Sequence, residues 1–258
     1  MSKRIFPKNL LSALLVAAGL LSTAYASGGE HHTAPKMDPT NDPSLQRGAK
    51  YFVNYCSGCH SLKYMRFNRL AKDIGITDDE GNVAEGLLRK DLMFTTTKIG
   101  DTLEVALTPE EGKKWFGVVP PDLSLEARSR GSAWIYHYLR GYYVDPTKRW
   151  GVDNIVFPGT AMPNILLNLQ GEQFPVYEKG QDAEMMAPKI SHLELRTAGQ
   201  LTPQQFDAVV YDITNFLTYV SDPIKEQRTR VGVWVMLFLV LMTTVLYLLK
   251  REYWKDLH

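Results

Sequence analysis

Two cysteines and one histidine form the most reactive group of side chains in this sequence. They stand in the run Cys56-Ser57-Gly58-Cys59-His60, which has the C-x-x-C-H spacing of a c-type haem attachment site. Two thiols three residues apart can add to the two vinyl groups along one edge of a porphyrin. The histidine that follows can then bind the iron from the proximal side. The motif predicts one covalently attached haem c, held by Cys56 and Cys59, with His60 as an iron ligand.

Two other uses of these side chains are a redox-active dithiol and half of a zinc site. A dithiol does not require a histidine directly after the second cysteine, and a zinc site would need two more ligands at short spacing. The chain contains 2 cysteines in total, so no third thiol competes for a structural disulfide. The spacing therefore favours haem attachment.

The N-terminus has the features of a secretory signal peptide. Basic residues at positions 3, 4 and 8 precede an apolar run over 10–21 and the small-residue box Ala24-Tyr25-Ala26. The apolar run is too short for an uncleaved membrane anchor, so we expect residues 1–26 to be removed. Residues 27–41, which include His31 and His32, are predicted to form a flexible segment.

A second apolar run lies near the C-terminus. Residues 231–249 contain no charged side chain and, at about 1.5 Å per residue, would form a helix of roughly 28 Å, enough for one bilayer crossing. Aromatic residues lie near both ends of the run, as they do at membrane interfaces, and basic residues flank both sides. The sequence predicts an anchor over 225–250. Because the signal peptide directs the body outward, residues 251–258 are expected to be a cytoplasmic tail.

Residues 42–224 remain as one domain of ordinary size, which the signal peptide would direct to the outer face of the membrane. The formal net charge of the whole chain is +1, but this domain carries more acidic than basic residues. An acidic surface in front of a membrane does not suit nucleic acid and is typical of a protein with a basic protein partner, or simply of a soluble domain.

The pattern of apolar residues predicts a mainly α domain. Asp42 followed by Pro43 is a helix start, and the apolar residues that follow recur at helical spacing up to Cys56. Gly48 and Ala49 would let a second helix approach closely. Residues 202–220 are the expected partner, with Thr202, Pro203 and Gln205 as a capping box, and two such crossed helices are the core of a c-type cytochrome. A shorter aromatic helix is expected over 132–143, and 145–190 as loop with short strands.

The sixth position of the iron has several candidate ligands. They are Met65, Met93, Met162, Met185, Met186, His137 and His192. Met65 is too close to the motif to reach the opposite face of a haem. Met162 lies in a loop with proline and glycine before it and proline after it, and such a stiff loop can present one side chain. A histidine–methionine pair raises the reduction potential and suits electron transfer.

The chain resembles cytochrome c1, the haem subunit of the cytochrome bc1 complex, of the proteobacterial kind. The resemblance covers nearly all of the chain after the signal peptide. It rests on the run from Cys56 to Tyr64, the segment Val119-Pro-Pro-Asp-Leu-Ser-Leu-Glu-Ala-Arg-Ser-Arg130, the loop from Phe157 to Asn164, and the C-terminal anchor. It implies a c-type cytochrome fold with long loop insertions.

The resemblance also implies the roles of single residues. Cys56 and Cys59 would be the thioether links, His60 the proximal ligand and Met162 the distal ligand, while Arg130 would meet a haem propionate. Pro121, in the Pro-Pro-Asp segment, is expected among the residues that contact the haem. Some family members carry a disulfide in the loop before the methionine, and this chain has no cysteines for it, so we expect that loop to be held by packing alone.

The implied function is the transfer of single electrons from a Rieske iron–sulfur protein to a soluble or tethered cytochrome c, beside a cytochrome b subunit in a dimeric complex. As an isolated chain the protein would not be an enzyme. A different membrane-anchored cytochrome c, feeding an oxidase or a denitrification enzyme, is the main alternative. A haem peroxidase, which would need an open sixth position, is the second.

Overall fold

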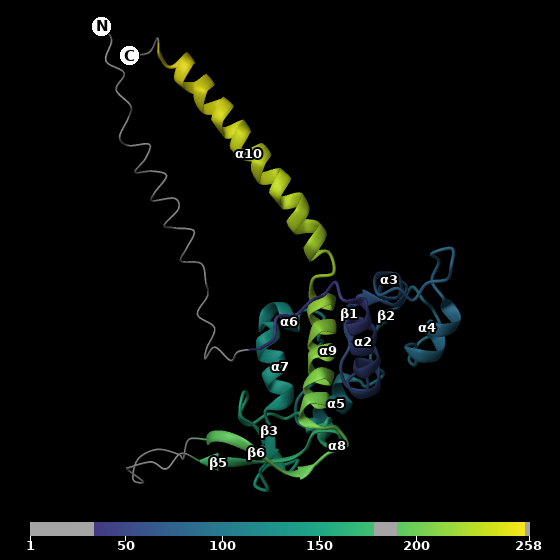
Figure 1. Cartoon of the computed structure of the whole chain (residues 1–258). Helices are drawn as coiled ribbons and strands as arrows, with labels where there is room; N and C mark the ends of the chain where they lie inside the picture. Colours follow the sequence, from purple (N-terminus) through teal and green to yellow (C-terminus); the bar gives the residue numbers. More distant parts are fainter. Residues whose placement is uncertain (1–33, 178–189, 256–258) are drawn as a thin grey trace, which may run out of the picture. The chain divides into compact units, whose positions relative to one another are not determined.

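The computed structural model describes residues 34–177 and 190–255 as a mainly helical protein with three small antiparallel sheets (Figure 1). The signal peptide, His31, His32, Met185 and Met186 lie outside the described residues. In chain order the elements are α2 (Asp42–Tyr55), β1 (Leu62–Arg66), α3 (Phe67–Asp73), α4 (Glu85–Asp91), β2 (Thr102–Leu103), α5 (Pro109–Phe116), α6 (Glu126–Ser129), α7 (Ser132–Arg140), β3 (Tyr142–Val144), β4 (Val152–Asn154), α8 (Leu167–Gln170), β5 (Gly171–Tyr177), β6 (Ile190–Ala198), α9 (Pro203–Ser221) and α10 (Lys225–Tyr253).

The core of the domain lies where α2 crosses α9 (Figure 1). Gly48 allows this close approach, because a Cβ atom at this position would lie 2.2 Å from the carbonyl oxygen of Asp212 and 2.6 Å from the Cβ of Phe216. Next to this contact the rings of Phe52 and Phe216 pack with centroids 5.6 Å apart, and both side chains are fully buried. The sequence-based prediction that Gly48 admits a partner helix is confirmed.

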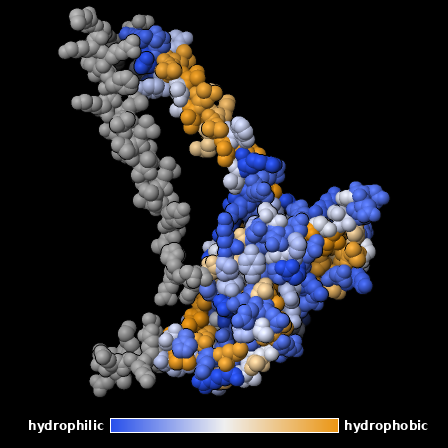
Figure 2. All heavy atoms as spheres, viewed as in Figure 1, coloured by the Kyte–Doolittle hydropathy of each residue, from blue (hydrophilic) through white to orange (hydrophobic). Residues whose placement is uncertain are grey.

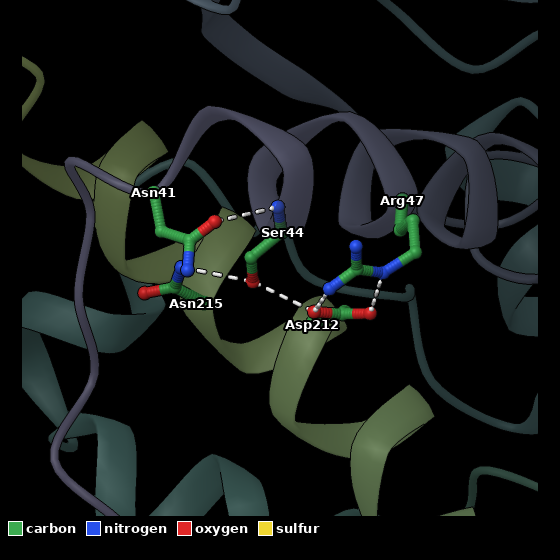
Figure 3. A network of polar contacts seen from close by, with 5 residues as sticks. All are labelled: Asn41, Ser44, Arg47, Asp212 and Asn215. Atoms are coloured by element: carbon green, nitrogen blue, oxygen red, sulfur yellow. Dashed lines mark hydrogen bonds and ion pairs between the residues drawn. The ribbon is translucent and has the colours of Figure 1, made fainter. Parts of the chain in front are cut away.

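A buried polar network joins the same two helices beside the glycine contact (Figure 3). Asp212 of α9 accepts hydrogen bonds from the Ser44 hydroxyl at 2.7 Å and from the Arg47 guanidinium at 2.6 and 3.0 Å. The amide nitrogen of Asn215 donates to the Ser44 hydroxyl at 3.1 Å. A buried carboxylate is costly unless charged and polar donors surround it, and the Asp212 carboxylate has three such hydrogen bonds.

Each of the two crossed helices, α2 and α9, begins at a capping signal in its local sequence. For α9 the prediction is confirmed: Thr202 and Gln205 form a complete capping box. For α2 the cap is Asn41, one residue before the predicted Asp42, because the Asn41 side chain accepts the backbone N–H of Ser44. Pro43 then occupies the first turn, where its missing N–H costs nothing.

Residues 34–41, expected to belong to a flexible segment, are packed against α9. Met37 is buried, and the carbonyl of Asp38 accepts a hydrogen bond of 2.7 Å from the amide of Asn215. Composition alone does not show that the backbone of Asp38 bonds a side chain 177 residues later.

The region between α7 and α9 contains more regular structure than the sequence indicated. Helix α7 ends at Arg140, earlier than the predicted 143, because Gly141 caps it and Tyr142 begins a strand. β3 pairs with β4, and β5 pairs with the nine-residue β6 to form a hairpin. The expected long loop is therefore partly a hairpin, and β3 lies beside it.

Helix α10 is the one helix among the described residues that is long and apolar enough to cross a membrane. None of its residues is buried within the chain, and Figure 2 shows an apolar middle with polar ends. A long apolar helix that its own chain does not cover is typical of a membrane span. The predicted fold, a mainly α domain with one C-terminal apolar helix, is confirmed.

Candidate functional site

The C-x-x-C-H run continues directly from the C-terminus of α2. Cys56 caps the helix, and its carbonyl accepts the N–H of Cys59 at 3.1 Å and the N–H of His60 at 2.9 Å. This turn keeps the two cysteines and the histidine together on one tight segment. Cys56 is buried and Cys59 is half-buried, and both thiols are free.

The ring of His60 is oriented by the backbone of Pro121. Its Nδ1 lies 2.7 Å from the Pro121 carbonyl oxygen, which can only accept, so Nδ1 carries the proton and Nε2 has the free lone pair. Burial lowers the pKa of His60, and the hydrogen bond to Pro121 partly offsets this. A neutral histidine with an oriented Nε2 is the form that binds iron.

Burial keeps both cysteines in the protonated thiol form. Burial raises the pKa of Cys56 to about 12 and also raises that of Cys59, so neither is a ready thiolate. Within residues 34–177 and 190–255 no three His, Cys, Asp or Glu side chains come together to hold a metal ion. Among these residues Cys56, Cys59 and His60 therefore have no further ligands for a zinc site, and their spacing is that of a haem attachment motif.

The segment that contains Pro121 forms hydrogen bonds with the residues that follow the C-x-x-C-H motif. The side chain of Asp122 accepts the N–H of Lys63 at 2.9 Å, and the Ser124 hydroxyl accepts the N–H of Tyr64 at 3.2 Å. The N–H of Leu123 donates to the carbonyl of Ser61 at 3.0 Å. These bonds place the Pro121 carbonyl where His60 needs it. Asp122 and Ser124 were missed as site residues, although Asp after Pro-Pro is a typical turn acceptor.

Met162 lies half-buried in the loop between β4 and α8. Its carbonyl accepts a hydrogen bond of 3.2 Å from the Tyr142 hydroxyl, and the carbonyl of Ala161 accepts one of 2.9 Å from the Trp150 indole. These two hydrogen bonds hold the carbonyl groups of Ala161 and Met162, and so fix the backbone before and after the Met162 N–H. Its role as distal ligand stays a prediction.

The prediction that packing alone holds this loop was wrong. The Asp153 carboxylate, which is buried, accepts the N–H of Gly159 at 2.7 Å, and the Asn154 side chain accepts those of Val156 and Phe157 at 2.9 and 3.2 Å. A set of side-chain-to-backbone hydrogen bonds therefore holds the loop without a disulfide. Asp153 and Asn154 were not predicted as residues that hold the loop, because their local sequence does not indicate which backbone groups they bond.

Arg130 connects the C-terminus of α6 to the Met162 loop. Its guanidinium forms an ion pair with Glu126 and lies 4.4 Å from the centroid of the Trp134 ring and 5.6 Å from that of Phe157. The side chain is 43% exposed. Cation–π contacts of this kind hold a guanidinium in one place, and the predicted contact with a propionate stays a prediction.

The remaining candidates for the sixth ligand lie in other surroundings. Met65 and Met93 are buried in the hydrophobic core, and His192 is exposed on β6. His137 lies within α7. Of the described methionines among the candidates, Met162 is the one placed on a loop outside the core.

These observations define the class of protein. A C-x-x-C-H turn at the end of one of two crossed helices, in which the Nδ1 of the histidine is hydrogen-bonded to a backbone carbonyl, is typical of a c-type cytochrome. More specifically, the chain belongs to the cytochrome C1 family, which it matches over residues 36–257. Members of this family carry a covalently bound haem c, so the predicted cofactor and family resemblance are confirmed.

Curated relatives match the chain over nearly its full length. It is 47% identical to the cytochrome c1 of Allochromatium vinosum, over 95% of this chain and 96% of the relative. It is 41% identical to a protein of Nitrosomonas europaea named ammonia monooxygenase gamma subunit, over 97% and 98%. The cytochrome c1 of Rhodospirillum rubrum is 28% identical, over 84% and 82%.

Proposed function

We propose that this chain is the haem-bearing subunit of a quinol–cytochrome c reductase, the cytochrome bc1 complex. It takes one electron at a time from a Rieske iron–sulfur protein and passes it to a soluble or tethered cytochrome c. The match to the cytochrome C1 family over residues 36–257, which includes the apolar helix, carries this proposal. The isolated chain is an electron carrier and breaks no bond of a substrate.

Each residue of the site would have a separate role in holding the haem. Cys56 and Cys59 form the two thioether links, His60 binds the iron through Nε2, and the Pro121 carbonyl keeps the imidazole in the required tautomer. Met162 is the distal ligand and Arg130 pairs with a propionate. The bound haem supplies a reversible one-electron carrier, whose potential a thioether ligand raises.

The domains would be arranged about the inner membrane of a bacterium. Residues 1–26 direct export, residues 42–224 form the haem domain in the periplasm, residues 225–250 cross the bilayer once, and residues 251–258 remain in the cytoplasm. The absence of any buried residue in α10 supports a lipid-covered helix that also contacts the cytochrome b subunit. The assembled complex is expected to be a dimer.

Purification of the complex from native membranes tests this proposal. With an affinity tag after His258, we expect cytochrome b and a Rieske protein to co-purify, and added quinol to reduce the haem of this chain. An inhibitor of quinol oxidation should block that reduction. A chain with His60→Ala is the matched control, since it keeps the anchor and loses the proximal ligand.

Other outcomes would contradict the proposal in distinct ways. Co-purification with an ammonia monooxygenase, the assembly that the name of the Nitrosomonas europaea relative suggests, would assign the chain to a different complex. Recovery with an oxidase or a denitrification enzyme would favour another anchored cytochrome. Turnover of hydrogen peroxide with an open sixth position would indicate a peroxidase.

A further inference from the structure

Three hydroxyl groups surround the backbone of Met162. The Tyr142 hydroxyl lies 3.2 Å from the Met162 carbonyl oxygen and 2.8 Å from the Tyr138 hydroxyl. The Tyr138 hydroxyl lies 2.8 Å from Oγ1 of Thr160, and this oxygen accepts the N–H of Met162 over a longer 3.4 Å. The contacts therefore begin and end on the backbone of one residue.

The contacts have a direction, because a carbonyl oxygen only accepts and a backbone N–H only donates. The Tyr142 hydroxyl donates to the Met162 carbonyl and to the Tyr138 hydroxyl, so its one proton is shared between two acceptors. Tyr138 can then give its own proton to Oγ1 of Thr160, which also accepts the N–H of Met162. Both ends of the set of contacts therefore meet at the backbone of Met162.

Burial keeps these groups in place. Tyr142 is 2% exposed, and the Trp134 ring stacks on that of Tyr138 at 4.9 Å with an angle of 9°. Burial also raises the pKa of Tyr142 above that of an exposed phenol, so its hydroxyl keeps the proton that it donates. Hydrogen bonds in such surroundings strengthen one another, and a buried acceptor that loses its donor is costly.

We propose that Tyr142, Tyr138 and Thr160 are positioning residues that close a hydrogen-bonded ring through the backbone of Met162 and so hold its sulfur on the iron. This inference rests on the proposed role of Met162 as distal ligand. The ring acts on the one residue that has to stay in place, whereas Asp153 and Asn154 hold the earlier part of the loop.

The ring predicts how easily an added ligand displaces the methionine. Imidazole can bind the ferric iron only in molecules in which Met162 has moved away, so its apparent affinity reports the fraction of open molecules. One buried hydrogen bond contributes about 0.5–1.5 kcal/mol, which corresponds to roughly a two- to tenfold change in that fraction. Tyr142→Phe and Thr160→Val remove one hydroxyl each with little change in shape.

The experiment is an imidazole titration of the full-length, haem-loaded chain in detergent, followed by the weak red absorption band of ferric iron–methionine bonding. We expect Tyr142→Phe and Thr160→Val each to raise the apparent imidazole affinity about two- to tenfold, with unchanged haem content. The double variant Tyr138→Phe/Tyr142→Phe should differ little from the single variants, because the ring opens only once. Tyr143→Phe, next to Tyr142 and outside the ring, should match the unmodified chain.

Several outcomes would overturn the inference. Unchanged imidazole affinity in Tyr142→Phe and Thr160→Val would show that the ring does not restrain Met162, and an equal rise in Tyr143→Phe would show a general effect of removing a tyrosine hydroxyl. If the Tyr142→Phe chain fails to accumulate, the imidazole affinity of the Thr160→Val chain alone tests the inference. Met162→Leu separates the two proposals: if it leaves the band and the imidazole affinity unchanged, the ligand assignment itself fails.

Discussion

The backbone carbonyl of Pro121 decides which nitrogen of His60 can meet an iron. Motif spacing predicts His60 as the proximal ligand, but it could not indicate the partner of Nδ1, because that partner lies 61 residues further along the chain. Asp122 and Ser124, on the same segment, place this carbonyl by bonding the backbone after His60. The residues that orient a ligand are thus less visible in the sequence than the ligand.

At the distal side, replacement of Met162 by leucine should lower the reduction potential markedly and leave the haem attached. Attachment uses Cys56 and Cys59, whereas a thioether ligand stabilises ferrous iron relative to water or nitrogen. The measurement is a redox titration with the ferric absorption spectrum. Met93→Leu is the control, because Met93 is buried in the core and its replacement should leave both unchanged. An unchanged potential in Met162→Leu would place another residue on the iron.

Arg130→Ala should lower the reduction potential by roughly 30–60 mV, since a unit positive charge near the iron favours the reduced state. Arg128 lies two residues earlier, in α6, and supplies the control Arg128→Ala, for which we expect little change in the reduction potential. Equal shifts in both variants would indicate a general surface effect. An unchanged potential in Arg130→Ala would mean that Arg130 only pairs with Glu126 and contacts Trp134.

At the scale of the elements, the crossing of α2 and α9 tolerates no side chain at position 48. Gly48→Ala should lower the free energy of unfolding by about 2–3 kcal/mol, because the new Cβ would lie 2.2 Å from the carbonyl oxygen of Asp212 and the helices would have to separate. Denaturant unfolding followed by haem absorbance measures this.

Gly86→Ala is the control for this substitution. Gly86 is also helical, but nothing lies within 4 Å of an added Cβ there, so alanine should be neutral or slightly stabilising. Equal destabilisation in the two variants would mean that helix propensity, rather than the close contact, explains the effect at Gly48.

The elements that could be predicted are those whose signals are local. The capping box at Thr202 and the charge-free run of α10 are contiguous in sequence, and both were recognised. The hairpin of β5 and β6 was not, since its two strands are separated by residues 178–189 in the sequence and β6 is mostly exposed. The hydrogen bonds of Asp153 and Asn154 to the Met162 loop likewise depend on where the folded chain brings distant backbone groups.

For the whole molecule, the anchor and the haem domain should be separable. A chain that ends after Asp222 should be soluble and carry haem with an unchanged spectrum, because α10 contributes no buried residue and no ligand. It should lose stable association with cytochrome b, measured by co-purification. A chain in which 231–249 is replaced by a polyleucine helix should return to the membrane and serve as control. A truncated domain with altered ligation would show that the helix does more than anchor.

The contact between α2 and α9 also sets the order of events as the chain is made. Ser44 and Asp212 are separated by 168 positions, so the first helix of the domain reaches its partner only when synthesis of the domain is almost complete. At roughly 5–20 residues per second, this delay is on the order of ten seconds or more. During this interval Cys56 and Cys59 belong to a helix end whose core partner does not yet exist. Cys56 therefore becomes part of a complete core only after α9 has been made.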